Sequence, residues 1–329
     1  MMTLSVIVPV YNGEKTIKRC LLSLLNQDYS NMEILVINDG SDDNTLAIVN
    51  KISEEYPERE IRIINKRNQG LPQARKTGVM FSNGDYIGFV DADDWVEPEM
   101  YSCMLERAFS LDLDIVSCDL SYDYKNHIDV HRQKMDEHTV YNNKEAISAV
   151  NNRYGVFPNM CNKVIRKSLF ENVKFLHGNF CGEDYSILIQ ILQNKCNVGI
   201  VKKALYHYVQ NDGSMGVGGY GGAQELGYHI YKRILYQVHK SFDSVTIKEY
   251  DNYFVNEFMF FVLAMGYNKN YDIDKIRWIQ KFIKKRIVHI ISNKHNTILC
   301  KGTSVVMCFS YKLVIIIFNF YRKFFVKWN

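Results

Sequence analysis

The sequence predicts an α/β fold, in which a Rossmann-like, mostly parallel sheet with flanking helices is followed by a helical C-terminal region. Over the first 120 residues, short β-branched runs alternate with helical patterns, which is typical of a parallel sheet covered by helices. Several of these runs end in polar residues, and ligands of open α/β sheets bind beyond the carboxyl ends of the strands. From Ala223 onward the pattern is helical and rich in aromatic residues.

The expected elements follow from this alternation. Strands are predicted at Leu4–Pro9, Glu33–Asn38, Ile61–Asn65, Tyr86–Val90 and Ile115–Cys118. Helices are predicted between them, at Lys15–Gln27, Asn44–Glu55, Leu71–Ser82 and Glu97–Ser110. Residues 122–152 are polar and weakly patterned, and we expect a ribbon and a short helix there. Later elements are expected at Asn162–Phe170, Glu183–Gln193, Ala204–Val209 (a strand), and in helices at Ala223–Lys240, Asp251–Tyr267 and Ile273–Ser292.

Between the two parts lies a glycine-rich stretch. Six of the ten residues from 213 to 222 are glycine, which favours a mobile loop or lid over a regular element. We find no internal repeat in the chain.

The composition excludes several classes of protein. With 47% hydrophobic and 23% charged residues, the chain is unlike a disordered one. Its eight cysteines are scattered singly without a CxxC pair, so we expect a reduced, cytosolic chain without zinc or disulfides. The first apolar run is too short for a signal peptide and has no basic flank, and no 18-residue apolar run predicts a membrane span.

The charges are divided unevenly along the chain. The whole sequence has 40 basic and 36 acidic residues, but from Lys275 to Asn329 there are 12 basic residues and no acidic one. The first 274 residues therefore carry a net charge of −8 and the last 55 carry +12. This asymmetry predicts an acidic body with a basic tail that meets an anionic partner.

Three carboxylates, Asp91, Asp93 and Asp94, lie within four residues after the fourth predicted strand. Because like charges repel, a strand end tolerates this cluster when a cation compensates it, and a divalent ion with oxygen ligands is the natural candidate. Such an ion could bridge a diphosphate and neutralise the charge that develops on it. The alternative is a solvated turn that caps the following helix.

Polar residues also follow the second strand, in Asp39-Gly40-Ser41. Asp39 could accept hydrogen bonds from a base or ribose, although the motif alone favours a capped β-to-α turn. Arg75 lies about one turn into a helix that begins near Pro72, where it could meet a phosphate, the Asp cluster or only solvent.

Glu183 and Asp184 head a further predicted helix. Acidic residues in the first turn are favoured by the helix dipole, which explains the pair without any function. The functional interpretation is a general base, which must come within hydrogen-bond reach of an acceptor hydroxyl.

Together, these motifs resemble glycosyltransferase family 2. The resemblance covers roughly residues 3–215 and rests on five segments in the right order and spacing, namely Ser5–Asn12 with Glu14, Asp39-Gly40-Ser41, Asn68…Gly70…Ala74-Arg75, Asp91–Asp94 and Gly182-Glu183-Asp184. It implies an inverting, metal-dependent enzyme of the GT-A fold that uses a nucleotide sugar. The implied domains are a catalytic domain at 1–215 (nucleotide-sugar half about 1–120, acceptor half about 121–215), a helical region at 216–300 and a basic amphipathic membrane-association helix at 301–329.

The resemblance also implies roles for residues near the donor. Pro9, Tyr11, Glu14 and Asp39 would line the uridine pocket, with Asp39 at the uracil edge. Arg75 would lie near the nucleotide and its diphosphate.

For the reaction itself, the resemblance implies that Asp91 and Asp93 form the family's DxD motif, which touches the ribose and Mn²⁺ or Mg²⁺, and that Asp94 could share the ion. Asp184 would be the base that deprotonates the acceptor hydroxyl for in-line attack on the anomeric carbon, and Glu183 would help to position it. One displacement inverts the configuration, so a single base suffices and no covalent nucleophile is needed.

The chain departs from its relatives at two places. Val209 stands where relatives often have Arg, so no phosphate contact is assigned there, and the nearby His207 is better explained as a structural residue beside tyrosines than as a metal ligand. Processive relatives carry a QxxRW motif, and Asp274–Trp278 lacks its Gln. We therefore expect the transfer of one sugar rather than polymer synthesis.

On a helix at about 100° per residue, the polar residues of the tail share one sector: Lys301, Ser304, Lys312, Asn319, Arg322, Lys323 and Lys327. The opposite side holds Val306, Met307, Leu313, Val314, Ile317, Phe318, Phe320, Phe324 and Phe325. This pattern predicts a helix lying on an anionic membrane surface. The alternatives are a helix docked on the protein's own core and a marginal span through Val305–Tyr321; no nucleic acid is expected, because the face opposite the charges is too apolar.

The sequence thus predicts a hexosyl or N-acetylhexosaminyl transferase, cytoplasmic and peripheral on the inner face of the bacterial cell membrane. It would move a sugar from a UDP-sugar to a hydroxyl of a lipid-linked oligosaccharide in capsule or exopolysaccharide synthesis. A glycoprotein or cell-wall polymer is an alternative acceptor. Rival hypotheses are a sugar nucleotidyltransferase, which would need a Gly-rich basic loop after the first strand, and a non-catalytic nucleotide-sugar-binding membrane subunit. A homo-oligomer is left open.

Overall fold

The computed structural model describes residues 3–210, 222–241, 244–267 and 271–325. The chain splits into two compact units, which consist of residues 1–147 with 155–211 and of residues 148–154 with 212–329. The predicted glycine-rich loop lies outside the described residues except for Gly222, and the predicted domain boundary at 215 falls there too.

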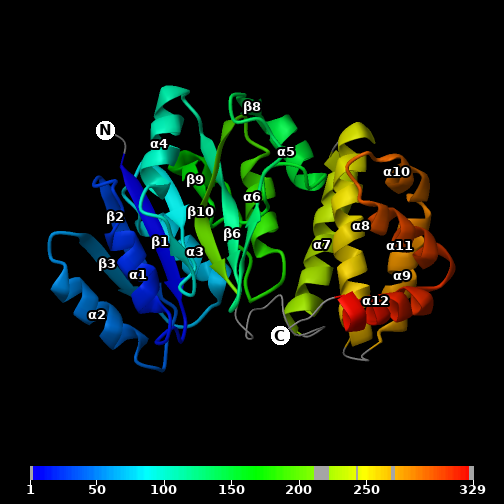
Figure 1. The fold of residues 1–329 in the computed structure, drawn as a ribbon, viewed down its shortest axis with the longest axis horizontal. Helices are drawn as coiled ribbons and strands as arrows, with labels where there is room; N and C mark the ends of the chain where they lie inside the picture. The colour runs from blue at the N-terminus through cyan, green and yellow to red at the C-terminus, as the bar shows by residue number, and fades with distance from the viewer. Residues whose placement is uncertain (1–2, 211–221, 242–243, 268–270, 326–329) are drawn as a thin grey trace. The chain divides into compact units, whose positions relative to one another are not determined.

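The first unit is built on one mixed sheet with the strand order β3-β2-β1-β4-β9-β6-β10-β5 (Figure 1). These strands are β1 (Leu4–Val10), β2 (Met32–Asn38), β3 (Glu60–Asn65), β4 (Tyr86–Phe89), β5 (Trp95–Val96), β6 (Ile115–Asp123), β9 (Lys163–Arg166) and β10 (Asn197–Val209). The four neighbouring strands β3, β2, β1 and β4 are parallel to one another, and β10 is parallel to β6. The predicted α/β fold with a mostly parallel sheet is confirmed.

Helices connect the parallel strands, as predicted. They are α1 (Ile17–Leu25), α2 (Thr45–Glu55), α3 (Leu71–Phe81) and α4 (Met100–Ser110). Helices α5 (Asn143–Asn151) and α6 (Glu183–Ile191) precede and follow the antiparallel strand β9 in the sequence. Every residue of β1 is buried, because helices cover a parallel sheet on both faces and its central strands can be apolar throughout. Parallel pairing brings the carboxyl ends of β1, β2 and β4 to one edge of the sheet, where the predicted motifs follow them.

Two antiparallel elements of the sheet were not predicted as strands, although β9 lies within Asn162–Phe170, where an ordered element was expected. β9 inserts between β4 and β6 and is antiparallel to both, and the two-residue β5 pairs with β10. Both strands are too short to show a period in the sequence. The 122–152 insertion contains the expected ribbon, since β7 (Ile128–His131) pairs with β6 and β8 (Tyr141–Asn142) pairs with β10, and it ends in helix α5.

The second unit is helical in its described residues. It contains α7 (Gly222–Ser241), α8 (Ser244–Tyr267), α9 (Ile273–Lys284), α10 (Ile287–Ser292), α11 (Ile298–Phe309) and α12 (Tyr311–Phe325). Its interior is aromatic: Trp278 lies 5.1 Å from Phe258, ring centre to ring centre, with Tyr228 and Phe282 beside them. Trp278 is thus explained by packing within this helical unit.

The tail forms two helices and not the single helix that we expected. The backbone is extended at Ser310, between α11 and α12. Val314 and Ile315 of α12 are buried, and Ile315 packs against Gly266 of α8. Ser304, expected in the polar sector, is also buried. The tail therefore docks in part on its own unit, which was one of the alternatives; the side chains from 321 onward lie outside the described ones.

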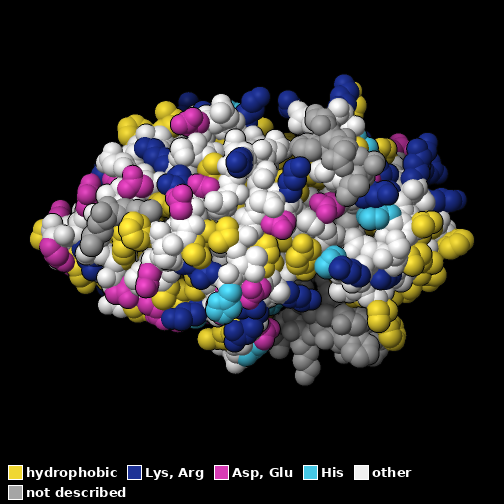
Figure 2. All heavy atoms as spheres, turned by 90° about the horizontal axis from the view of Figure 1, so that it is seen from above, with side chains coloured by type: hydrophobic (Ala, Val, Ile, Leu, Met, Phe, Trp, Pro, Cys, Tyr) yellow, Lys and Arg dark blue, Asp and Glu magenta, His cyan; other side chains and the backbone are white. Residues whose placement is uncertain are grey.

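Docking leaves a second set of apolar side chains uncovered on α10, α11 and α12. The most exposed of them are Ile298 (90%), Phe309 (85%), Val288 (79%), Ile316 (62%), Leu299 (61%) and Phe320 (61%). In Figure 2, hydrophobic and Lys/Arg side chains gather over this unit, on the right of the view. Of the helices that the structure describes, none is both long enough and apolar enough to cross a bilayer.

Candidate active site

The loop after β1 is fastened to the loop after β2. The N–H of Asn12 donates to Ser41 Oγ at 3.0 Å, and the carboxylate of Glu14 accepts two hydrogen bonds from Asn44, both at 3.2 Å. Asn12 has a positive φ of 52°, which Asn adopts more readily than most residues. Pro9 is buried in β1, whereas Tyr11 stands half-exposed on the loop. The two loops therefore form one connected rim at the sheet edge.

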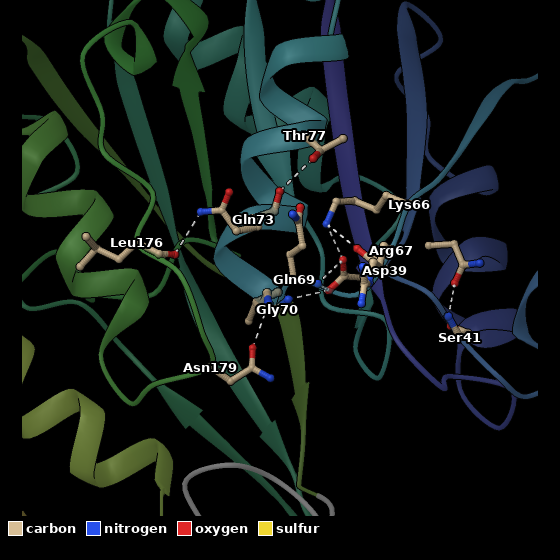
Figure 3. A network of polar contacts seen from close by, with 12 residues as sticks. Asp39, Ser41, Lys66, Arg67, Gln69, Gly70, Gln73, Thr77, Leu176 and Asn179 are labelled. Atoms are coloured by element: carbon tan, nitrogen blue, oxygen red, sulfur yellow. Dashed lines mark hydrogen bonds and ion pairs between the residues drawn. The ribbon is translucent and has the colours of Figure 1, made fainter.

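The carboxylate of Asp39, directly after β2, is surrounded by donors of its own chain (Figure 3). Its Oδ1 accepts from Lys66 Nζ at 2.5 Å, and its Oδ2 accepts from the N–H of Gly70 at 2.8 Å. The N–H of Gln69 lies 3.1 and 3.2 Å from the two oxygens. These partners compensate for burial, because Asp39 is only 3% exposed.

Arg75 of α3 lies at the centre of the site and is fully buried. Its Nη1 donates to Asp184 Oδ1 and lies 3.8 Å from Glu183 Oε1, and its Nη2 donates to Asp91 Oδ1 at 3.1 Å. One guanidinium thereby joins the end of β4 to the first turn of α6. The sequence left a phosphate, the Asp cluster or solvent as partners of Arg75. In the structure, Arg75 pairs with carboxylates.

Asp94 is turned into the protein. Its Oδ2 accepts from the hydroxyl of Tyr206 at 2.5 Å, its Oδ1 accepts from the N–H of Val209 at 2.8 Å, and the residue is 1% exposed. The same hydroxyl lies 3.2 Å from the N–H of Asp91. Asp94 and β10 therefore hold the loop after β4 in place, and a bound ion would have to share Asp94 with these two donors.

The site has more negative than positive charge. Asp91, Glu183 and Asp184 lie around Arg75, and Asp93 and Asp94 lie close to Asp91. Burial raises the pKa of Asp91 to about 6, with Arg75 opposing the shift and Asp184 adding to it. Burial and the charge of Asp184 raise the pKa of Glu183 to about 8. This shift favours the protonated form of Glu183, which would limit the repulsion within the pair.

This surplus of carboxylate oxygens fits a divalent cation, which prefers oxygen ligands and would relieve the repulsion between Asp91 and Asp93. Among the residues described by the structure, however, no three His, Cys, Asp or Glu side chains already converge in a metal-binding arrangement. The donor set fits the ion by its chemistry.

His207 occupies a structural position. Its ring stacks on Trp95 with centroids 3.5 Å apart, its Nδ1 lies 3.0 Å from Asp123, and its Nε2 lies 2.9 Å from Glu97. Trp95 Nε1 also donates to Asp123, at 3.0 Å. Because both ring nitrogens are engaged, His207 holds β5 against the end of β10, consistent with our structural interpretation.

Some residues of the site were missed in the sequence. Lys66 could have been found, because it follows β3 and the parallel register Asn38↔Asn65 brings the end of β3 beside Asp39. Gln73 and Asn179 carry no such signal. Gln73 contacts the segment before α6, and Asn179 contacts the start of α3. Each contact joins residues more than a hundred positions apart, so only the folded chain brings them together.

The sequence also matches a family model described as "Glycosyl transferase family 2" over residues 5–192, more than half of the chain. Among curated proteins, "Uncharacterized glycosyltransferase EpsJ" of Bacillus subtilis (strain 168) is 45% identical over 116 residues, which are 35% of this chain and 33% of EpsJ. "Minor teichoic acid biosynthesis protein GgaB" of the same strain is 29% identical over 219 residues, which are 64% of this chain and 23% of GgaB. The match thus spans a third or less of these relatives.

Among solved structures, S. aureus TarS 1-349 in complex with UDP-GlcNAc superposes with a TM-score of 0.68 at 18% identity. The match covers 97% of this chain and 92% of that one. At this identity the likeness establishes a shared GT-A fold.

Proposed function

Because this chain belongs to glycosyltransferase family 2, we propose that it moves a sugar from a UDP-sugar to a hydroxyl acceptor with inversion at the anomeric carbon. The observation that carries the proposal is Arg75, which gathers Asp91 of the DxD motif and the Glu183-Asp184 pair at the edge of the sheet where ligands bind. The residues proposed for the donor and for the base come from three elements, and they lie around the guanidinium of Arg75.

For the donor, we propose a pocket lined by Pro9, Tyr11, Glu14 and Asp39, with Arg75 near the diphosphate. The half-exposed ring of Tyr11 offers a stacking surface for uracil, and Asp39 offers a carboxylate to its N–H edge. TarS, which shares the fold, has been crystallised with UDP and with UDP-GlcNAc, which makes UDP the appropriate first probe.

For the chemistry, Asp184 would accept the proton of the acceptor hydroxyl as the oxygen attacks the anomeric carbon. The bond to the leaving UDP breaks on the opposite face, which inverts the configuration. Glu183 would position Asp184, and the Arg75 ion pair keeps the base carboxylate directed into the site. Mn²⁺ or Mg²⁺, held by Asp91 and Asp93 with a share from Asp94, would supply charge neutralisation at the diphosphate.

The acceptor we propose is a lipid-linked oligosaccharide of a bacterial surface polysaccharide. The name of GgaB points to teichoic acid synthesis, which supports the glycan class of the acceptor. The enzyme would work on the cytoplasmic face of the membrane, where nucleotide sugars and lipid-linked acceptors are both accessible.

The uncovered apolar side chains of α10–α12 support membrane attachment. We define the membrane face as Val288, Ile291, Ile298, Leu299, Phe309, Leu313, Ile316, Ile317 and Phe320. The basic residues Lys284, Lys285, Lys294 and Lys312 lie exposed on or next to the same helices, and no acidic residue occurs after Asp274. Apolar side chains flanked by Lys alone match an anionic leaflet in both polarity and charge.

Calorimetry with UDP tests the donor assignment. Wild-type protein should bind UDP in the presence of Mn²⁺, and EDTA and Asp93→Ala should each weaken binding by about tenfold or more. A screen of UDP-sugars for slow hydrolysis would then identify the sugar. If the wild type does not bind UDP, the donor assignment is wrong. If UDP binds but neither EDTA nor Asp93→Ala changes the affinity, the metal assignment is wrong.

A further inference from the structure

Helix α3 begins without a capping side chain of its own. Its N-cap residue, Gly70, has φ of 87° and no side chain, so the first N–H groups of the helix must find partners elsewhere. The N–H groups of Gln69 and Gly70 donate to Asp39. The N–H of Leu71 donates to Asn179 Oδ1 at 3.0 Å, and Pro72 has no N–H to satisfy. The helix is therefore capped by two residues from distant parts of the chain.

Asn179 belongs to the segment that leads into the carboxylate pair. It lies four positions before Glu183, the first residue of α6. The contact is close, since a Cβ at Gly70 would lie 2.7 Å from Asn179 Oδ1. A side chain at position 70 would displace the Asn179 amide from the Leu71 N–H, which gives the glycine a steric as well as a conformational reason.

A second contact fastens the same segment to the next turn of α3. The side-chain amide of Gln73, which is 6% exposed, donates to the carbonyls of Phe175 and Leu176 at 2.8 and 3.2 Å. Figure 3 shows Gln73 and Gly70 meeting this segment from one end of the helix, with Asp39 on its other side. The third contact is the Arg75 ion pair with Asp184.

Residues 175–184 are thus held by three positions of α3, Leu71, Gln73 and Arg75, while Asp39 accepts from the two N–H groups just before the helix. A ligand that engages Asp39 competes with, or reorients, the N–H groups of Gln69 and Gly70. Gln69 and Gly70 directly precede Leu71, so a change at Asp39 would act next to the N–H that Asn179 caps.

We propose that Asn179 is a positioning residue that couples occupancy of the nucleotide pocket to the placement of the Glu183-Asp184 pair, with Gln73 as its second anchor. The proposal rests on the proposed function, because it assumes that a nucleotide binds beside Asp39. Neither residue touches the reacting atoms; each acts through the segment that it holds.

The hydrogen-bond roles give opposite expectations for two conservative variants. Asn179 acts here only as an acceptor, so Asn179→Asp keeps the bond to the Leu71 N–H and adds a charge that the helix N-terminus favours. Gln73 acts only as a donor to two carbonyls, so Gln73→Glu replaces both bonds with repulsion between oxygens. A role in packing alone would make both variants harmless.

Hydrogen exchange with and without UDP tests the coupling, and calorimetry on the same samples reports binding. In the wild type, UDP should slow amide exchange in residues 173–191 by about tenfold. Asn179→Ala and Gln73→Glu should bind UDP within about threefold of the wild type yet lose this protection, whereas Asn179→Asp should retain it. Lys174→Ala alters an exposed side chain of the same segment and should behave as the wild type.

The outcomes separate the two proposals. If the wild type fails to bind UDP, the proposed donor pocket is wrong and the coupling falls with it. If UDP binds but leaves residues 173–191 unprotected, or if Asn179→Ala keeps the full protection, the coupling alone is overturned. Because Asn179 is exposed, its loss should leave the fold intact, and Asn179→Asp supplies an independent check in a variant that keeps the cap.

Discussion

At the scale of single residues, Arg75 organises the site. A buried guanidinium costs desolvation energy unless carboxylates surround it, and Asp91, Glu183 and Asp184 do so here. The same contacts raise the pKa of Arg75 against the effect of its burial, so it stays charged at any working pH. If Arg75 were lost, the negative charge of these carboxylates would have no compensating cation.

Asp184 offers the most direct test of the reaction. Asp184→Asn keeps a polar group of the same size beside Arg75, but an amide cannot accept the acceptor's proton. Turnover should fall by about 10²–10⁴-fold. Affinity for UDP should stay within about threefold, because the base does not contact the nucleotide. Steady-state transfer kinetics and calorimetry measure the two quantities; a variant that keeps more than a tenth of the wild-type rate would rule out Asp184 as the base.

Glu33 of β2 contributes a pH-dependent stability. Burial acts to raise its pKa, but hydrogen bonds from Ser5 Oγ, the Asn83 N–H and Arg62 outweigh burial and lower the pKa from 4.5. Because the folded-state pKa lies below the unfolded one, this stabilisation is present above about pH 4.5 and is lost as the pH falls through the folded-state value.

Glu33→Gln should therefore cost about 1–3 kcal/mol of unfolding free energy at pH 7, and the gap from the wild type should narrow below pH 4.5. Urea unfolding at pH 7 and at pH 3.5 measures it. Glu55→Gln is the control, since its pair with Lys51 is solvent-exposed and should contribute close to nothing. An equal gap at both pH values would refute the assignment.

At the scale of secondary-structure elements, α3 can position Arg75 because the helix packs directly on β1. A Cβ added at Gly78 would lie 2.3 Å from Cγ2 of Ile7, so the helix approaches the strand more closely than a side chain at this position would allow. This approach brings Arg75 within reach of Asp91, which follows the neighbouring strand β4.

Gly78→Ala should therefore destabilise the protein by about 1–3 kcal/mol through overpacking, despite the better helix propensity of Ala. Combination with Ile7→Ala should recover part of the loss, which a double-mutant cycle would measure. Gly302→Ala in α11, where the added Cβ meets nothing within 4 Å, should be neutral or stabilising by up to about 1 kcal/mol. Equal effects at both glycines would contradict the packing explanation.

At the scale of the whole molecule, charge and apolar surface are divided between the two units. The carboxylates of the site lie in the first unit, and the proposed membrane face lies in the second, whose sequence after Asp274 has no acidic residue. Because Met307 and Val314 are buried in their unit, removal of the tail would expose core. Point substitutions are therefore the sharper test of membrane attachment.

The double variant Phe309→Ser with Ile316→Ser should weaken binding to vesicles of phosphatidylglycerol by about tenfold or more. Each substitution removes an apolar side chain that would otherwise be buried in the membrane interface. Phe109→Ser is the matched control, since Phe109 is 72% exposed but lies on the first unit. Cosedimentation at low and high salt measures both the apolar and the charge contribution. Undiminished binding of the double variant would exclude this face.

From the sequence alone, most of the parallel half of the sheet could be predicted. The runs from Leu4 to Val10 and from Met32 to Asn38 are long and β-branched, so period and length identify them, and Asp39 directly follows the second run. β9 could not be found in this way, because four residues hold no readable period and its place between β4 and β6 depends on pairing that is not local.

What the sequence determined by itself is therefore the fold class, the family and the order of the motifs, all of which depend on local patterns. Only the tertiary structure decided which groups meet: Lys66 at Asp39, Tyr206 at Asp94, and Arg75 between Asp91 and Asp184. It also decided that the apolar side of the tail is divided, with Val314 buried and Phe320 exposed. The reason is physical, because hydrogen bonds and ion pairs between residues far apart in the chain depend on distances that no local pattern encodes.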